Sequence, residues 1–273
     1  MLKQRVITAI ILAVIVVGTI LGLNSFYASL LFAVMLFFSI SEMINLTLTR
    51  SHVLQWLIGL AGVGAYFVAL PEMGIRLIAW HSYTGLILWM LILLALTRYR
   101  HSGHWPLAQR IAVSTFSFIL FWICVQGLYF IHHHFEQGGW LLMYLLTLVW
   151  VADIGAYFSG KRFGKNKLAP AISPGKTREG VAGGLALNAL WITLVFYLSG
   201  GWGMDYVSFL LLGLVTSSIS VVGDLYESVL KREAGMKDSG KILPGHGGVL
   251  DRIDSVIAAT PVFLSGLFWL GAV

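Results

Sequence analysis

The chain has 273 residues, of which 58% are hydrophobic and 11% charged, and its mean hydropathy is +0.84. Soluble globular domains carry about 25% charged residues, so this composition excludes an ordinary soluble protein and indicates an integral membrane protein. The net charge is +6, but no helix-turn-helix or RNA-binding motif accompanies it. Anionic lipid headgroups therefore explain the positive charge better than a nucleic acid does.

Apolar segments long enough to cross a bilayer, which takes about 20 residues, recur along the whole chain. We expect an all-α, polytopic helical bundle with about nine transmembrane helices. They are predicted at residues 6–23, 27–46, 53–70, 77–97, 111–131, 139–158, 180–199, 205–223 and 255–272. The first segment follows a charged start, as a signal peptide does, but no small-residue cleavage site follows it, so we predict a retained span.

The basic residues sort to one side of this predicted topology. With the N-terminus placed in the cytoplasm, every lysine and arginine except Arg76 falls on the cytoplasmic side. This distribution is the one that the positive-inside rule describes. Nine spans then place the C-terminus outside, and in a bacterium the membrane is expected to be the cytoplasmic (inner) membrane.

Polar, glycine-rich segments are concentrated in the second half of the chain. We divide the sequence into N-terminal transmembrane helices, residues 1–135, and a C-terminal catalytic region, residues 136–273. The C-terminal region contains two long loops that we expect in the cytoplasm, residues 159–179 and 224–254. Both are rich in glycine, proline and basic side chains, so we expect the function to lie in them.

The first loop follows an acidic residue near the end of a predicted span. Asp153 is either an interfacial acid without function or a functional group, and intramembrane ionisable residues usually mark function. Farther on, Gly175, Lys176 and Thr177 suggest a phosphate-binding P-loop. The earlier glycine that this motif requires is Pro170, and no strand is predicted before it, so a P-loop is excluded.

The second loop gathers cations, acids and glycines between apolar spans. If the eighth span continues as a helix past the membrane surface, Asp224, Ser228 and Lys231 share one face. Asp251 and Asp254 repeat this spacing where the ninth span begins. Helix capping alone would explain acids in a first turn. Because Asp224 ends a neighbouring span and carboxylate oxygens suit hard cations, we predict a metal site with Asp224 and Asp251 as ligands.

A fixed order of residues runs through the second loop. It comprises Ser228, Leu230, Lys231, Arg232, Lys237, Asp238, Gly240, Leu243, Pro244, His246, Gly247, Gly248, Val249, Asp251, Arg252, Ile253 and Asp254. A second set precedes it at Asp153, Gly155, Ala156, Tyr157, Ser173, Pro174, Lys176, Thr177, Glu179 and Gly180. Both sets resemble segments of the phosphatidate cytidylyltransferase (CDP-diacylglycerol synthase) family, and so many fixed spacings are far more specific than a lone glycine motif.

The resemblance implies an enzyme, a nucleotidyltransferase that moves a cytidylyl group from CTP to phosphatidate and releases pyrophosphate. It implies Mg²⁺ as cofactor, leaves room for a second cation, and makes CTP, phosphatidate and membrane lipid the partners; a homo-oligomer is compatible with it. The expected catalytic residues are Asp224, Lys231, Asp251 and Asp254. The expected substrate-binding residues are Asp153, Lys176, Ser228, Arg232, Lys237, His246, Gly247, Gly248 and Arg252. Lysine and arginine neutralise phosphoryl charge, and glycine lets backbone N–H groups approach a phosphate.

For three residues the sequence leaves two possible roles open. His246 either hydrogen-bonds substrate or fixes its turn, and Asp238 either pairs with a lysine or binds a second metal ion. Glu42, near the inner end of the second span, either lines a polar cavity or pairs with a cation.

Two other functions fit part of the sequence. Another membrane transferase that uses CTP, acting on a different lipid or on a polyprenol, would share the chemistry of the loops. A transporter or channel would fit the bulk composition, but charged residues are absent from the predicted mid-span depths. The polar chemistry gathers on one face instead, which favours the enzyme.

Overall fold

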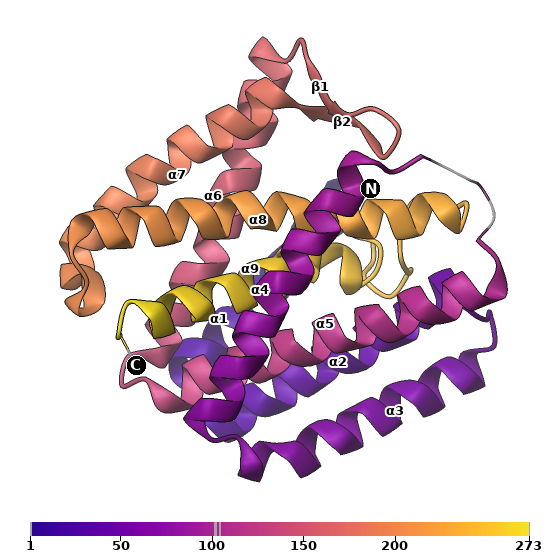
Figure 1. Ribbon diagram of the computed structural model, residues 1–273, viewed down its shortest axis with the longest axis horizontal. Helices are drawn as coiled ribbons and strands as arrows, with labels where there is room; N and C mark the ends of the chain where they lie inside the picture. Colours follow the sequence, from indigo (N-terminus) through magenta and orange to yellow (C-terminus); the bar gives the residue numbers. More distant parts are fainter. Residues whose placement is uncertain (1, 101–102, 104, 273) are drawn as a thin grey trace. The chain divides into compact units, whose positions relative to one another are not determined.

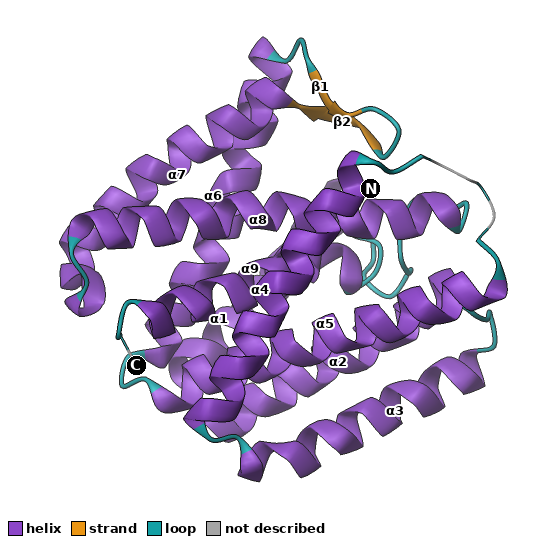
Figure 2. Ribbon diagram, in the orientation of Figure 1, coloured by secondary structure: helices purple, strands orange, loops and turns teal. Residues whose placement is uncertain are grey.

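The computed structural model describes residues 2–100, 103 and 105–272, with only the backbone of Leu2, Lys3 and Arg5. The side chains of Lys3 and Arg5, which the topology prediction uses, therefore lie outside the described part. Within that part the fold is almost entirely helical (Figures 1 and 2). The α-helices are α1 (Leu2–Gly22), α2 (Ser25–Thr47), α3 (His52–Ala69), α4 (Ile75–Thr97), α5 (Leu107–His134), α6 (Gly138–Phe163), α7 (Arg178–Ser199), α8 (Tyr206–Glu233) and α9 (Leu250–Trp269). Two short 3₁₀ helices, η1 (Leu70–Glu72) and η2 (Gly200–Gly203), follow α3 and α7. The predicted all-α class is confirmed.

Each predicted span corresponds to one of these helices. In the described part of the chain, seven helical segments are long and apolar enough to cross a membrane: α2, α3 with η1, α4, α5, α6, α7 with η2, and α8. Helix α1 contributes a shorter apolar stretch, Val6–Gly22, and α9 carries Asp251, Arg252 and Asp254 in its first residues. The chain is therefore a polytopic integral membrane protein. Which side of the membrane each loop faces stays a prediction.

The first long loop contains a small antiparallel hairpin that the sequence analysis missed. Strand β1 (Lys167–Ala169) pairs with strand β2 (Ser173–Thr177), and Figure 2 shows them as the orange ribbon beyond α6. Such short strands, with proline, glycine and lysine in them, lack the alternation of apolar and polar residues by which a strand is predicted. The hairpin brings Lys176 onto a paired strand, immediately before α7.

The chain forms two compact units. The first comprises residues 1–78, 102–143 and 229–254, and the second comprises residues 79–101, 144–228 and 255–273. The loop between α8 and α9 belongs to the first unit, and the β-hairpin belongs to the second.

In the first unit, α2 packs against both α3 and α5, and Figure 1 shows these three helices side by side. A Cβ atom at Gly62 of α3 would lie 2.5 Å from Ile40 Cδ1 on α2, so the glycine permits a close approach. Near the end of α2, the hydroxyls of Thr47 and Ser114 on α5 are hydrogen-bonded at 2.7 Å. These contacts fix the end of α2 that carries Glu42.

In the second unit, glycines allow α6 and α7 to lie close together. A Cβ atom at Gly155 of α6 would lie 2.8 Å from Gly184 Cα of α7. Asn188 of α7 is fully buried and donates hydrogen bonds to Leu148 O at 2.8 Å and to Ser217 Oγ of α8 at 2.9 Å. A buried amide with partners on both neighbouring helices fixes their register, because leaving it unpaired in an apolar interior would be costly.

Candidate functional site

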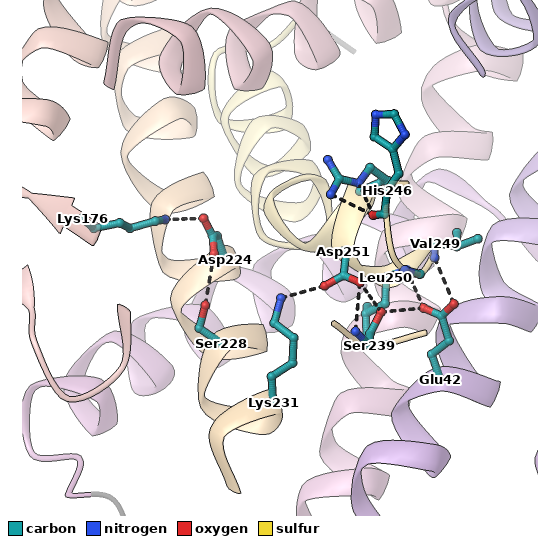
Figure 3. Close-up of polar contacts among 12 residues, drawn as sticks. Glu42, Lys176, Asp224, Ser228, Lys231, Ser239, His246, Val249, Leu250 and Asp251 are labelled. Atoms are coloured by element: carbon teal, nitrogen blue, oxygen red, sulfur yellow. Dashed lines mark hydrogen bonds and ion pairs between the residues drawn. The ribbon is translucent and has the colours of Figure 1, made fainter. Parts of the chain in front are cut away.

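The loop between α8 and α9 is organised around the carboxylate of Asp251 (Figure 3). Its Oδ2 atom accepts hydrogen bonds from Ser239 N at 2.9 Å, Ser239 Oγ at 3.0 Å and Gly248 N at 2.8 Å. Its Oδ1 atom accepts a hydrogen bond from Lys231 Nζ at 2.7 Å, and only 5% of the Asp251 side chain is exposed. One carboxylate thus joins the last turn of α8, the middle and the end of the loop, and the first turn of α9.

Asp251 is held in its charged form. Burial opposes ionisation, but the hydrogen bond and charge of Lys231, with the N–H groups of Gly248 and Ser239, outweigh it and keep the pKa of Asp251 below its usual value. The group is therefore a carboxylate at neutral pH, and its two oxygens share the negative charge that faces Lys231.

A second carboxylate, from far away in the sequence, holds the same loop. Glu42 of α2 is 4% exposed, and its Oε2 atom accepts hydrogen bonds from Ser239 Oγ and from Leu250 N, both at 2.8 Å. Its Oε1 atom accepts one from Val249 N at 3.0 Å. Leu250 is the first residue of α9, so Glu42 caps that helix by satisfying N–H groups that have no partner inside it. These donors are N–H and hydroxyl groups, and Glu42 also lines a cavity of about 1010 Å³.

The two carboxylates explain why adjacent glycines follow His246. Gly247 has φ +83°, in the left-handed region, and a Cβ atom there would lie 2.6 Å from Asp251 Oδ2. At Gly248 a Cβ atom would lie 2.2 Å from Glu42 Oε2. Any larger residue at either position would displace a carboxylate that holds the loop.

Basic side chains surround a polar cavity of about 600 Å³ beside this loop. Lys237, Lys241, His246 and Arg252 line it, together with Gly245 and Gly247. The guanidinium of Arg252 donates to His246 O at 3.2 and 2.9 Å, so it spans the turn that contains the glycines. The predicted substrate-binding residues Lys237, His246, Gly247 and Arg252 thus meet at one cavity, whose charge suits phosphate groups.

In the second unit, Asp224 is the centre of a smaller cluster. Its carboxylate forms an ion pair with Lys176 of strand β2 and accepts a hydrogen bond from Ser228 Oγ at 3.3 Å (Figure 3). The side chains of Lys176 and Asp224 are 24% and 29% exposed, so both reach solvent. The hairpin thus brings together a lysine and an acid that are far apart in sequence.

A cavity of about 380 Å³ in the same unit lies between α6, β2 and α7. Asp153, Tyr157 and Lys176 line it. Thr177 caps α7 by accepting a hydrogen bond from Gly180 N at 3.1 Å, and Glu179 accepts one from Asn166 Nδ2 at 2.6 Å. These contacts hold the hairpin against the start of α7, which fixes Lys176 at the cavity.

The remaining predicted site residues lie at the helix ends next to the loop. Arg232 is exposed in the last turn of α8, and Asp254 is half-buried near the start of α9. Helix α8 continues to Glu233 without a break, which meets the condition under which Asp224, Ser228 and Lys231 share one helix face at steps of three and four residues. Catalytic and binding roles for all of these residues stay predictions.

The sequence analysis missed Ser239 and left the role of Glu42 open. Ser239 is fully buried, and its hydroxyl contacts both Glu42 and Asp251. An acid within an otherwise apolar predicted span was the available signal for Glu42. No comparable signal marks a serine in a polar loop.

The predicted metal ligands, Asp224 and Asp251, each lie beside a lysine. No group of three or more His, Cys, Asp or Glu side chains capable of holding a metal ion occurs among the described residues. Asp224 and Asp251 each direct one oxygen at a lysine ammonium, so each carboxylate already accepts a cation. Mg²⁺ is usually held by one or two carboxylates with water and substrate phosphates, so these hard oxygen donors fit an ion that arrives with a nucleotide.

The fold and this site define a polytopic helical membrane protein with a cation-rich loop that is held by two buried carboxylates. Comparison with known proteins gives the family. The sequence matches the model of the Cytidylyltransferase family over residues 3–269, and the chain belongs to that family.

Individual relatives agree over almost their whole length. The chain is 38% identical over 282 residues to the phosphatidate cytidylyltransferase of Haemophilus influenzae, covering 96% of this chain and 97% of the relative. It is 40% identical over 277 residues to that of Pseudomonas aeruginosa, covering 98% and 97%. It is 32% identical over 265 residues to that of Staphylococcus saprophyticus, covering 96% and 97%.

Proposed function

We propose that this chain is a phosphatidate cytidylyltransferase, which uses CTP and phosphatidate to make CDP-diacylglycerol and pyrophosphate. The observation that carries the proposal is its similarity, over 96% or more of its length, to relatives with that name. The loop around Asp251 supports it independently, because a cationic, glycine-rich cavity suits the phosphate groups of a nucleotide.

The reaction joins two anions. A phosphate oxygen of phosphatidate attacks the α-phosphorus of CTP and forms a new P–O bond. The bond from that phosphorus to the oxygen bridging the β-phosphate breaks, and pyrophosphate leaves with its electron pair. A phosphomonoester carries a charge of about −1.5 to −2 at pH 7, so the attacking oxygen is already ionised and needs no general base. Repulsion between the substrates is then the main obstacle.

The side chains around the loop can reduce this repulsion. We propose that Lys237 and Arg252 bind phosphate oxygens in the 600 Å³ cavity, with backbone N–H groups at Gly247 contributing. His246 O already orients the Arg252 guanidinium. Lys231 and Lys176, each beside a carboxylate, would supply further positive charge to the phosphates. We assign Ser228, Arg232, Asp153 and Asp254 to substrate contacts or to their support.

We propose Mg²⁺ as the cofactor, with Asp224 and Asp251 as the carboxylates that hold it. Bound there, the ion would neutralise charge on phosphate oxygens. The support is the chemistry of the donors, oxygen atoms that already contact cations.

We also propose that the reaction takes place on the cytoplasmic side, in the inner membrane if the source is a bacterium. The support is the distribution of basic residues, which gather in the loops that hold both clusters. Labelling single cysteines introduced at Lys241 and at Glu136 in intact cells with a membrane-impermeant maleimide would test it. We expect labelling at position 136 alone. Labelling at position 241 alone would show that the loops face the opposite side of the membrane from the one we propose.

The experiment that tests the activity uses the purified full chain in mixed micelles with phosphatidate, CTP and Mg²⁺. We expect release of pyrophosphate and formation of CDP-diacylglycerol, identified by mass spectrometry, with ATP, GTP and UTP as comparison nucleotides. A folded preparation that releases no pyrophosphate would overturn the proposal. Turnover of a polyprenol or another lipid in preference to phosphatidate would assign the chain to a different CTP-dependent transferase.

A further inference from the structure

Two cavities of the first unit share one wall. The polar cavity of about 600 Å³ lies beside a larger one of about 1010 Å³, and Lys237, Asp238, Gly240 and Lys241 line both. A short stretch of the loop between α8 and α9 thus separates two spaces, and its two lysines border each of them.

The two cavities differ in their chemistry. Aromatic side chains line the larger one, namely Phe37 and Phe38 of α2 and Trp56 of α3. Arg50, from the short connection between these helices, adds a cation to the shared lysines. The smaller cavity has basic side chains and glycines on its walls, and no Phe, Tyr or Trp lines it in the described part of the chain.

We propose that the larger cavity binds the phosphatidate, with its phosphate at Arg50, Lys237 and Lys241 and its apolar chains along Phe37, Phe38 and Trp56. The smaller cavity then takes the triphosphate of CTP. This inference rests on the proposed function and adds to it the binding site of the lipid, on helices of the N-terminal half.

The position of the larger cavity in the fold favours a lipid over a soluble phosphate. Helices α2 and α3 are both long and apolar enough to cross the membrane, and Trp56 near the start of α3 is 57% exposed. Arg50 lies where these helices connect, which is the depth of the lipid headgroups when the helices span the bilayer. A lipid can therefore place its phosphate among the cations while its acyl chains stay beside apolar helix surfaces.

Arg50 is suitably placed to exchange its partner for a phosphate. Its Nη1 atom donates to the thioether sulfur of Met236 at 3.0 Å. Sulfur is a weak acceptor, whereas a phosphate oxygen forms a strong, charge-assisted hydrogen bond with a guanidinium. Since the chemistry requires the lipid phosphate next to the α-phosphate of CTP, the shared lysines lie where both anions need charge neutralisation.

Photolabelling tests the site without depending on turnover. The probe is a phosphatidate with a photoreactive group in one acyl chain, added to the full chain in micelles, with labelled peptides identified by mass spectrometry. We expect labelling of α2 and α3 at Phe37, Phe38 or Trp56, competed by unlabelled phosphatidate but not by phosphatidylcholine or inorganic phosphate. Labelling confined to Tyr157 and its surroundings on α6, or labelling that phosphatidylcholine competes equally, would overturn the proposal. If inorganic phosphate competes as strongly as phosphatidate does, the cations bind a free phosphate, and the proposed lipid site is overturned as well.

Steady-state kinetics separates this inference from the proposed function. Arg50→Gln and Trp56→Ala are expected to raise the KM for phosphatidate, by about tenfold for the arginine, and to leave the KM for CTP within about twofold. Matched controls are Arg98→Gln and Leu57→Ala, which change an exposed cation and an exposed apolar residue outside the cavity. An unchanged lipid KM in both cavity variants would overturn the inference while leaving the proposed activity intact. A wild-type chain that is folded but inactive with phosphatidate would overturn the proposed function, and photolabelling would then decide the lipid site by itself.

Discussion

Glu42 of α2 accepts a hydrogen bond from the backbone N–H of Leu250, a residue 208 positions further along the chain. Through this bond, and those from Val249 and Ser239, a helix of the N-terminal half holds the start of α9 and the loop before it. The charge of a carboxylate suits a helix N-terminus, where N–H groups point outward. The N-terminal helices therefore contribute directly to the geometry of the loop that we propose binds phosphate.

We expect Glu42→Gln to destabilise the loop and to slow turnover. The glutamine amide places an NH₂ group against N–H or hydroxyl donors where the native chain has an acceptor. Each buried donor left without a partner costs about 1–3 kcal/mol. Thermal unfolding in detergent, followed by circular dichroism, should show a lower midpoint together with a lower kcat. Glu72→Gln, at an exposed acid in η1, is the matched control, and equal midpoints for the two variants would contradict this role of Glu42.

The stability that Asp251 contributes should depend on pH. Its pKa in the folded chain lies below the ordinary value of 3.8, so its contribution is complete above that value and is lost as the pH falls through the folded pKa. We expect the free energy of unfolding of Asp251→Asn to be about 2 kcal/mol lower than that of wild type at pH 7, so the variant should unfold at a lower temperature. The two melting curves should converge in acid, below about pH 3.8.

Melting temperatures measured from pH 7 to pH 3 in one detergent would check this convergence. Glu136→Gln, which changes an exposed acid, should have the same melting temperature as wild type at every pH in this range. A constant difference between Asp251→Asn and wild type over the whole pH range would rule out the charge as the cause.

The glycines after His246 should not tolerate alanine. Gly247→Ala imposes left-handed backbone strain of about 1–2 kcal/mol and a contact with Asp251, whereas Gly248→Ala pushes against Glu42. We expect both variants to lose most activity and to unfold at lower temperature. Gly64→Ala is the control, because no atom lies within 4 Å of a Cβ atom at that exposed helical position. Full activity of Gly248→Ala would show that the Glu42 carboxylate can move without consequence.

Magnesium dependence provides a test of Asp224. We expect chelation by EDTA to abolish turnover and added Mg²⁺ to restore it. If Asp224 holds the ion, Asp224→Asn should raise the Mg²⁺ concentration for half-maximal activity by about tenfold or more, since a charged ligand is lost. Asp224→Asn should still fold, because the side chain is 29% exposed. A magnesium titration curve identical to that of Glu136→Gln would remove Asp224 from the metal site.

Much of the fold was predictable from local sequence. An apolar stretch of about 20 residues can satisfy its backbone in a membrane only as a helix or in a closed barrel, so all the predicted spans appear as helices. The spacing of Asp224, Ser228 and Lys231 suits one face of a helix, and α8 does continue past them to Glu233. The small hairpin was not predictable in this way, because its pairing depends on the partner strand more than on a pattern within either strand.

The sequence alone determined that this is a helical membrane protein and predicted which loop carries the chemistry, since hydropathy, charge and motif spacing are properties of neighbouring residues. Only the tertiary structure decided how that loop is held. The Ser239 hydroxyl donates toward Glu42, 197 positions away, and toward Asp251, and the two carboxylates occupy the space that Gly240, Gly247 and Gly248 leave open. Such contacts depend on how the helices pack. Packing brings together residues that are far apart along the chain, so no local sequence pattern predicts the contact.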